Sequence, residues 1–463
     1  MNIFDIAIIG GGPAGYVAAE RAGAKGLKVV LFDKRALGGV CLNEGCIPTK
    51  TLLNSAKVME YAREAENYGI SVGIVLADFE SIMKRKDKVV RKLVAGVGAK
   101  MKHAGVEVVK ASAMIKEKQN DTITITADGN DYQARNLLIC TGSEAAVPPI
   151  QGLDPAQVMT NREILQLKEL PESLVIIGGG VIGTEFADFF NAMGTKITVI
   201  EMLPEILTGV DEEIAAFVRN EFTKRGIDFH LNAKVTAIND KTVIYEKDGQ
   251  TGSITGDRIS LSVGRKTNVS GIGLENIGVD YTPKGIKIDR NCRTNIPNVY
   301  AAGDVTGFSL LAHTASREAE VAVNHILGRK DVMRYDAIPG VVYTHPEIAG
   351  VGLTEAEAKK KGIEIECRKL SMAYAGRFVA ENEGKEGFCK VIVGKKYGKI
   401  LGIHMVGGAC SEMIWGACTL IEMQMRVKDV QEIVFPHPTV SEIIKETIFQ
   451  FESLTVQGSK FKV

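Results

Sequence analysis

Two cysteines separated by four residues are the part of this sequence best suited to chemistry. Cys41 and Cys46 lie in GGVCLNEGCIPTK, residues 38–50. If the chain is helical from Leu42 onward, the sulfur atoms lie about one and a half turns apart, close enough to bridge if the first turn distorts. A disulfide closing so short a loop removes little entropy from the unfolded chain, so its better use is to open and close. The spacing alone does not favour this over two buried, reduced cysteines.

The surroundings of the pair favour redox chemistry. A thiolate at a helix N-terminus is stabilised by the helix dipole and by unpaired amide groups, which lowers its pKa. Metal binding is disfavoured, because no other Cys or His lies near the pair in the sequence. Eight cysteines in 463 residues, mostly scattered singly, suit a reducing compartment. We therefore expect a cytoplasmic protein whose close cysteine pair is functional.

A glycine-rich turn precedes the cysteines in a context typical of dinucleotide binding. The apolar run 4–9 predicts a strand, a helical pattern follows the turn, and a second apolar run, 28–32, ends in Asp33. Three glycines occupy the GxGxxG positions: Gly10, Gly12 and Gly15. The first two permit a tight turn and the close approach of a pyrophosphate, and the third lets the helix pack on the strand. Asp33 is placed to accept hydrogen bonds from ribose hydroxyls.

The same arrangement recurs later in the chain. The apolar strands 174–177 and 196–200 flank a second turn and helix, and Glu201 follows the second strand. The glycines of this copy are Gly178, Gly180 and Gly183. The last glycine precedes the acid by 18 residues in both copies. Two copies with matching spacing predict two dinucleotide sites in one chain.

The second acid also predicts which nicotinamide cofactor binds. A carboxylate at Glu201 binds the 2′-hydroxyl of NAD and repels the 2′-phosphate of NADP. The next residues, Met202, Leu203 and Pro204, supply no arginine cluster to hold a phosphate. The sequence therefore favours NAD. A further strand and glycine close each unit, and Gly142 and Gly264 are added to the candidate cofactor-binding residues.

The cysteine segment resembles the redox-active segment of the flavin-dependent pyridine nucleotide-disulfide oxidoreductases, and most of all their dihydrolipoamide dehydrogenase (E3) branch. The resemblance assigns FAD to the first nucleotide site and NAD to the second. Lys50 resembles the family lysine beside the flavin N5, and Glu185, in GTEFA, resembles its ion-pair partner. Without the family, each would be interpreted as an ordinary surface charge. AAGD, ending at Asp304, resembles the second FAD motif, and His313 matches a helix start near the flavin with a positional role.

A second chemical motif lies near the C-terminus, in FPHPTVSE at residues 435–442. His437 stands between two prolines on rigid, non-helical backbone, and Ser441 or Thr439 is expected to cap the helix that follows. Taken alone, His437 is more typical of a loop histidine than of a general base. The segment resembles the family's HPT..SE signature, which implies that His437 and Glu442 form an acid–base dyad acting across a dimer. Phe435 stands where family members often have a histidine.

The resemblance extends over nearly all of the chain and implies an α/β fold with two Rossmann-like domains, for FAD and NAD, and a C-terminal α+β dimerisation domain. The expected FAD domain is discontinuous, because the NAD domain is inserted into it. The expected domains are residues 1–145 (FAD, first part), 146–267 (NAD), 268–338 (a central domain completing the FAD domain) and 339–463 (dimer interface).

The activity implied is oxidation of protein-bound dihydrolipoamide with reduction of NAD to NADH. Cys41 would exchange with the substrate and Cys46 would communicate with the flavin, which passes a hydride to NAD. The implied partners are a second copy of the chain, as a homodimer, and a lipoyl-bearing protein, either the E2 subunit of a 2-oxo acid dehydrogenase or the glycine cleavage H protein. Lys and Arg together number 56, as do Asp and Glu, so charge indicates neither nucleic acid nor an anionic membrane.

Other functions fit the sequence less well. A mercuric reductase-like enzyme is disfavoured, because that family carries a cysteine pair near its C-terminus, where this chain ends in GSKFKV, and because the chain begins directly at the flavin strand. Another NAD(P)H-dependent disulfide oxidoreductase and a non-catalytic flavoprotein subunit are further alternatives. The presence of Cys41, Cys46 and His437 argues against a loss of activity. No apolar run is long enough to span a bilayer, and no metal site is expected.

Overall fold

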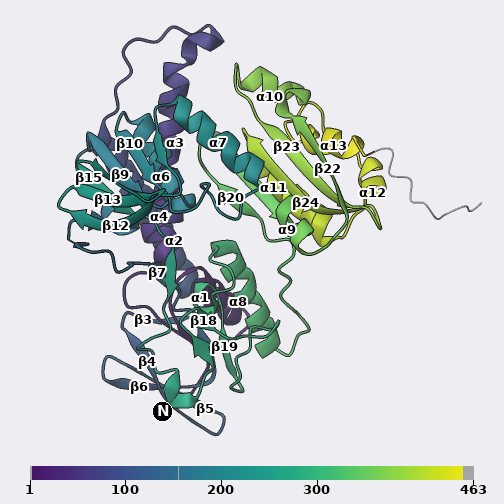
Figure 1. The fold of residues 1–463 in the computed structure, drawn as a ribbon. Coiled ribbons are helices and arrows are strands. Elements are labelled where there is room, and N and C mark those ends of the chain that lie inside the picture. The colour runs from purple at the N-terminus through teal and green to yellow at the C-terminus, as the bar shows by residue number, and fades with distance from the viewer. Residues whose placement is uncertain (1–2, 155, 452–463) are drawn as a thin grey trace, which may run out of the picture.

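The structure is a computed structural model that describes residues 3–154 and 156–451 (Figure 1). The terminal GSKFKV segment lies outside the described residues. Three sheets organise the chain. Figure 1 shows the first near the N-terminus at the bottom, the second at the upper left and the third at the upper right. Within the described ranges, none of the helices is long and apolar enough to cross a membrane.

The first sheet carries the first glycine turn, between β1 and helix α1 (Pro13–Gly23). Its strand order is β3-β2-β1-β6-β5-β4, with β19 paired to β6. The strands are β1 (Ile3–Ile9), β2 (Val29–Phe32), β3 (Glu107–Val109), β4 (Ala113–Gln119), β5 (Thr122–Ala127), β6 (Asn130–Ile139) and β19 (Val299–Ala301). The β1, β2, β6 and β19 pairings are parallel. Helix α8 (Ala312–Ile326) packs against α1.

The second sheet carries the second glycine turn, between β9 and helix α6 (Val181–Ala192). Its order is β11-β10-β9-β15-β8, with every pairing parallel. The strands are β8 (Val158–Met159), β9 (Ser173–Ile177), β10 (Lys196–Ile200), β11 (Asp228–His230) and β15 (Arg258–Leu261). Parallel strands buried on both faces read as continuous apolar runs, which is why the sequence predicts β9 and β10 well.

An antiparallel sheet beside the second one has no counterpart in the sequence-based expectation. It consists of β12 (Lys234–Asn239), β13 (Thr242–Lys247) and β14 (Gln250–Thr255). Most of its side chains are exposed or half-buried, with Ile238 and Val243 as its buried apolar residues. A strand with so few buried positions leaves a weak apolar pattern.

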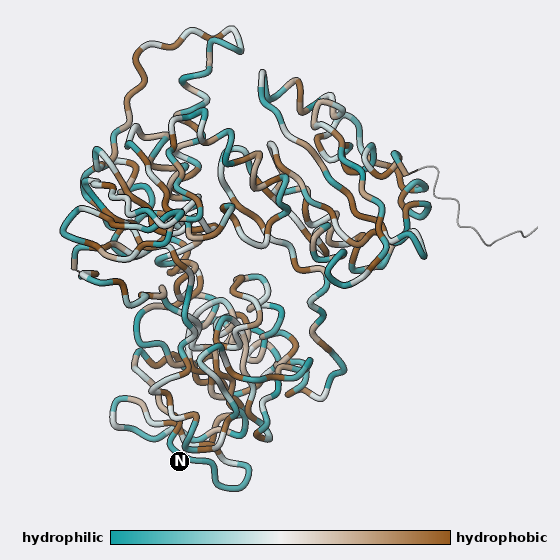
Figure 2. The backbone as a smooth tube through the Cα atoms, viewed as in Figure 1, coloured by the Kyte–Doolittle hydropathy of each residue, from teal (hydrophilic) through white to brown (hydrophobic). Residues whose placement is uncertain are grey.

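The third sheet is antiparallel, in the order β20-β21-β24-β23-β22. Its elements are β20 (Gly340–Val342), β21 (Glu347–Gly352), β22 (Ile365–Ser371), β23 (Phe388–Gly394) and β24 (Lys399–Gly407), with helices α9 (Glu355–Lys360), α10 (Gly376–Glu381), α11 (Cys410–Glu422), α12 (Val427–Gln431) and α13 (Glu442–Phe449). The predicted antiparallel strands 390–393 and 400–406 are confirmed as parts of β23 and β24. In Figure 2 the brown, hydrophobic segments follow the strands of the sheets.

A buried ion cluster ties the third sheet to the second unit. Lys390 of β23 is 4% exposed, and its Nζ lies 3.0 Å from Asp211, 2.7 Å from Glu213 and 2.9 Å from Glu355. Asp211 caps helix α7 (Glu212–Lys224) of the second unit, and Glu355 begins α9. A buried ammonium needs paired carboxylates, so Lys390 fixes the two units against each other.

The helix at the cysteines is not continuous, in contrast to the expectation of a helix from Leu42 onward. Helix α2 (Gly39–Glu44) ends at Gly45, and α3 (Cys46–Arg63) begins at the second cysteine. Gly45 has φ −145° and ψ −107°, outside the helical region, which breaks the hydrogen-bond pattern between the cysteines. Together the sheets and helices confirm the α/β class, whereas the domain boundaries near 145, 267 and 338 stay predictions.

Candidate active site

The break at Gly45 brings the two thiols together. Cys41 is the third residue of α2 and Cys46 is the first residue of α3, and both are free thiols close enough for one side chain to act as hydrogen-bond partner of the other. That hydrogen bond lowers the pKa of Cys46, against the opposing effect of burial, and the Lys50 ammonium lowers it further. The same contact, with burial, raises the pKa of Cys41. Cys46 is therefore the thiol that ionises first, and its charge is held inside the protein.

Lys50 supplies the positive charge beside that thiol. One turn beyond Cys46 on α3, its Nζ donates to both carboxylate oxygens of Glu185, at 2.9 and 2.8 Å. Glu185 comes from α6, so the pair joins the two nucleotide-binding units. Burial opposes the charge on Lys50, but the Glu185 carboxylate outweighs it and raises the pKa of the lysine. The ammonium is thus fixed in place and stays charged.

The first glycine turn fits the phosphates of a dinucleotide. Gly10 has φ +108°, and a Cβ there would lie 2.1 Å from the Cys140 carbonyl oxygen, so no other residue fits. A Cβ on Gly15 would lie 1.7 Å from the Gly10 oxygen, because the helix packs directly on the strand. Gly12 precedes the first residue of α1, whose unpaired amides face the turn. Asp33 accepts the Gly11 amide at 2.7 Å, which holds the turn against β2.

The second turn repeats this geometry. Gly178 has φ +103°, and a Cβ there would lie 2.5 Å from the Ser262 carbonyl oxygen, while Gly183 packs against Gly178. Glu201 accepts the Gly179 amide at 2.7 Å and the Leu203 amide at 2.8 Å. Each carboxylate oxygen keeps a further lone pair for a ribose hydroxyl.

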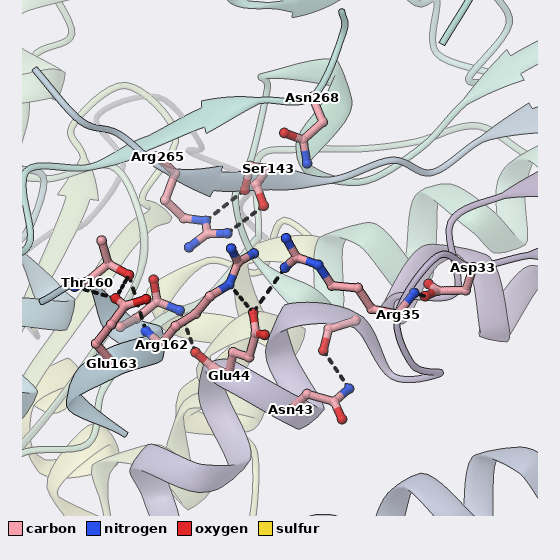
Figure 3. A network of polar contacts seen from close by, with 12 residues as sticks. Asp33, Arg35, Asn43, Glu44, Ser143, Thr160, Arg162, Glu163, Arg265 and Asn268 are labelled. Atoms are coloured by element: carbon pink, nitrogen blue, oxygen red, sulfur yellow. Dashed lines mark hydrogen bonds and ion pairs between the residues drawn. The ribbon is translucent and has the colours of Figure 1, made fainter. Parts of the chain in front are cut away.

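Two short strands join the units at the site (Figure 3). β7 (Ser143–Ala145) pairs with β16 (Arg265–Thr267), directly after Gly142 and Gly264. The Ser143 hydroxyl donates to Asp304 at 2.5 Å and accepts from Arg265 Nε at 2.7 Å. Arg265 also donates to the Ser143 carbonyl oxygen at 2.7 Å. Asp304, in the second FAD-like motif, is thereby held beside β7 and β16, the two short strands that join the units.

The loop between the cysteines is clamped from the second unit. Arg162 Nε lies 2.6 Å from a Glu44 carboxylate oxygen, and Asn161 donates to the Glu44 carbonyl oxygen at 2.6 Å. Figure 3 shows Arg35 reaching the same carboxylate from the other side, at 3.5 Å. Glu44 is the residue before the break at Gly45, so this clamp stabilises the bend that joins the thiols.

One cavity of about 2260 Å³ connects these groups. It is more than twice the size of a usual ligand site, which is enough for two dinucleotides. The predicted residues that line it are Cys41, Cys46, Lys50, Gly10, Gly12, Asp33, Gly142, Asp304, Gly178, Gly180, Glu185, Glu201, Gly264 and His313. Gly15 and Gly183 lie behind it, in the helix–strand packing. His437 and Glu442 do not line it.

The histidine segment differs in one respect from expectation. Neither Ser441 nor Thr439 caps α13 through its side chain. Instead Glu442, the first residue of α13, accepts the Thr439 amide at 3.0 Å and lies 2.9 Å from His437 Nδ1. The Glu442 carboxylate thus fixes the segment before α13, and a charged acceptor makes a stronger hydrogen bond than a neutral hydroxyl does. His313 lies elsewhere, with Nε2 2.9 Å from the Pro339 carbonyl oxygen, and burial lowers its pKa.

Comparison with known proteins identifies the family. The family model described as pyridine nucleotide-disulphide oxidoreductase matches residues 4–319, and its dimerisation domain matches residues 338–448. The chain belongs to this family. A dihydrolipoyl dehydrogenase of Mycoplasma pneumoniae is 38% identical over 450 residues, covering 96% of this chain and 97% of the relative. One from Bacillus subtilis is 37% identical over 448 residues, covering 96% and 95%.

Solved structures agree with the family assignment. LpdA from Mycobacterium tuberculosis superposes with a TM-score of 0.89 at 26% identity, covering 97% of this chain and all of that one. The HOCl-induced flavoprotein disulfide reductase RclA from Escherichia coli superposes with a TM-score of 0.84 at 27% identity, covering 96% and 99%. Members of the pyridine nucleotide-disulphide oxidoreductase family bind dinucleotides, which agrees with the two glycine turns and the single connecting cavity.

Sequence reasoning missed several residues of the site. Arg265 directly follows the predicted Gly264, and Ser143 follows the predicted Gly142. Their positions next to predicted cofactor-binding glycines could have identified both residues. Glu318 lies five residues after the predicted His313 and accepts the Gly303 amide at 2.6 Å, next to Asp304. Arg162 carried no local signal, because its contact with Glu44 joins segments that are far apart in the sequence. Across the described ranges, no group of three or more His, Cys, Asp or Glu side chains is arranged to hold a metal ion.

Proposed function

We propose that this chain is a dihydrolipoamide dehydrogenase, which oxidises dihydrolipoamide to lipoamide and reduces NAD⁺ with FAD as its bound cofactor. The observation that carries the proposal is the placement of the Cys41 and Cys46 thiols beside Lys50, in a cavity running between two dinucleotide-binding turns. Curated relatives with this name match nearly the whole chain. Glu201, without a neighbouring arginine cluster, favours NAD over NADP at the second turn.

The chain's own groups have distinct roles in this reaction. A substrate thiolate attacks the Cys41–Cys46 disulfide at Cys41, and the second substrate thiol then displaces Cys41, which leaves lipoamide and a reduced cysteine pair. His437, oriented by Glu442, removes the substrate thiol proton. Cys46 leaves as a thiolate because Cys41 and Lys50 lower its pKa. FAD, when bound, supplies the two-electron transfer from the thiols to NAD⁺.

The active unit in this proposal is a homodimer. The dimerisation domain of the family matches residues 338–448. The same region exposes large apolar side chains: Trp415, Met423 and Val434 are 72%, 70% and 92% exposed in the single chain. Apolar groups gathered on one unit are typical of a surface that a partner covers. The homodimer would also bring His437, which lies outside the cavity of its own chain, to the cysteines of the other subunit.

The proposed substrate is a lipoyl group borne by another protein. The partner would be an E2 subunit or a glycine cleavage H protein. We place the reaction in the cytoplasm, since eight mostly scattered cysteines fit a reducing compartment.

A spectrum and a turnover assay test the proposal. The purified protein should show bound flavin, and stepwise dithionite titration should consume two electrons more than the flavin alone requires. Steady-state turnover should be seen with free dihydrolipoamide and NAD⁺, and not with glutathione disulfide or Hg²⁺ and NADPH. The proposed activity would be excluded if the protein took up only the two electrons that flavin requires. It would also be excluded if turnover occurred only with glutathione disulfide or with Hg²⁺ and NADPH.

A further inference from the structure

A tyrosine from the third sheet completes the setting of the flavin-site lysine. Tyr343 follows β20, and its ring centroid lies 4.6 Å from Lys50 Nζ. Its backbone amide donates to Glu185 Oε1 at 3.0 Å, the same oxygen that accepts from Lys50. The Lys50 ammonium therefore contacts both the Glu185 carboxylate and the Tyr343 ring, and the Tyr343 backbone amide in turn donates to Glu185.

The loop that carries Tyr343 is itself anchored to α6. The His345 amide donates to Asp188 Oδ2 at 2.8 Å, one turn after Glu185 on the same helix. Arg225 bridges the anchor, because it donates to the His345 carbonyl oxygen at 2.8 Å and lies 2.7 Å from Asp188 Oδ1. Two buried carboxylates of one helix thus fix the loop from below, which leaves the Tyr343 ring little freedom to move away from Lys50.

An ammonium held by only one carboxylate swings on its flexible stem, and an aromatic face restrains it without neutralising its charge. We propose that Tyr343 is a positioning residue whose ring keeps the Lys50 ammonium at the Cys46 side of the cavity. This inference rests on the proposed function, because it assigns Tyr343 a part in the same thiol chemistry. The ring contributes through contact with Lys50, and its hydroxyl has no part in the effect.

The charged and titratable groups that act on Cys46 come from every element around it. They are Cys41 of α2, Lys50 of α3, Glu185 of α6, Tyr16 of α1, Arg265 of β16 and Tyr343. Two of these groups are cations, Lys50 and Arg265, and the Lys50 ammonium lowers the pKa of Cys46. Releasing the lysine head therefore weakens the stabilisation of the thiolate, and the midpoint of its titration moves upward.

The test uses the flavin-containing Cys41→Ser protein, in which Cys46 is the single thiol of the pair. The long-wavelength absorbance of the Cys46 thiolate beside oxidised flavin is titrated with pH. Tyr343→Leu in this background should move the midpoint upward, because the released Lys50 ammonium stabilises the thiolate less, by at most about half a pH unit since the ring acts only through the lysine. Tyr343→Phe, which keeps the ring and the amide, should leave the midpoint in place.

Tyr397→Leu is the matched control, because Tyr397 lies over Lys396 at 5.0 Å on an exposed turn away from the cavity. It should not move the midpoint. An unchanged midpoint in Tyr343→Leu would overturn the inference, as would an equal shift in Tyr343→Phe or in the control. The titration needs no substrate, so its outcome is separate from that of the dihydrolipoamide assay. If the wild type did not turn over dihydrolipoamide, the proposed function would be wrong. The titration midpoints of the Tyr343 variants could still be compared.

Discussion

Glu442 Oε1 lies 2.9 Å from His437 Nδ1, and the other carboxylate oxygen accepts the Thr439 amide at 3.0 Å. Because Nδ1 faces the carboxylate, Nε2 is the ring nitrogen left to exchange a proton with a substrate. The Thr439 amide and His437 lower the pKa of Glu442, so the carboxylate is ionised at neutral pH. The His437 side chain is 79% exposed in the single chain.

Substitution of this histidine should separate the two halves of the reaction. We expect His437→Gln to reduce kcat with dihydrolipoamide by at least about 10²-fold, the usual contribution of a positioned general base. Flavin binding and electron transfer from NADH to a dye should be retained, since neither uses this proton. The two assays on one preparation make the measurement. A loss below tenfold, or an equal loss in both assays, would contradict the assignment.

Mixed dimers test whether the dyad serves the other subunit. We expect a purified heterodimer of wild type with a His437→Gln/Cys46→Ser double mutant to be inactive, because each site would lack either its thiol or its base. A heterodimer of two differently tagged wild-type chains is the control and should be fully active. Half of that activity in the mixed dimer would show that each site is complete within one chain.

The two cysteines should give different spectra when substituted singly. Cys46→Ser should abolish the long-wavelength absorbance that a thiolate gives beside oxidised flavin on two-electron reduction. Cys41→Ser should show that absorbance without reduction, because Cys46 remains beside the flavin as a thiolate. The difference follows from Cys46 being the thiol whose pKa is lowered. Identical spectra from the two variants would refute the division of roles.

Cofactor preference follows from Glu201, whose carboxylate already accepts two backbone amides and has no adjacent arginine. A 2′-phosphate there would face a negative charge without compensation. We expect kcat/KM for NADH to exceed that for NADPH by at least about 10²-fold, corresponding to about 3 kcal/mol. Near-equal values measured under the same conditions would be incompatible with this role of Glu201.

The Lys390 cluster predicts a pH-dependent stability. Lys390→Met leaves the buried Asp211 carboxylate without its ammonium partner and should destabilise the chain at pH 7 by about 3 kcal/mol. Hydrogen bonds from Lys359 and Lys390 lower the pKa of Glu355 to about 2. Its contribution is therefore complete above the ordinary carboxyl range near 4.5 and is lost as pH falls toward 2.

Thermal melting of wild type and Lys390→Met measures this contribution. The difference in melting temperature should be large at pH 7 and should narrow between about pH 4.5 and pH 2. Lys369→Met is a suitable control, because Lys369 contacts Glu213 at the surface. A difference that is the same at pH 7 and pH 3 would rule out the carboxylates as its source.

The parts of the fold that follow local rules were predictable. β1, β9 and β10 are buried runs, and the turns at Gly10 and Gly178 need backbone conformations that glycine supplies, so both units could be inferred from sequence. The break at Gly45 could not be predicted, since a glycine within a helical pattern is usually tolerated. Tyr343 escaped detection for another reason. Its partners lie near residues 50 and 185, and only the packing of the third sheet on α6 brings them together.

The pairing of β6 with β19 has a consequence for how the protein is made. Leu137 of β6 lies beside Val299 of β19, so the first sheet is left unfinished while the whole second unit is synthesised. During that interval residues 137–139 of β6 lack a neighbour on the side that β19 later fills, and the Asp304 segment has not yet left the ribosome. The second sheet closes within its own stretch of chain and is free to fold first. Capture of the first cofactor therefore comes late in translation, after most of the chain has emerged.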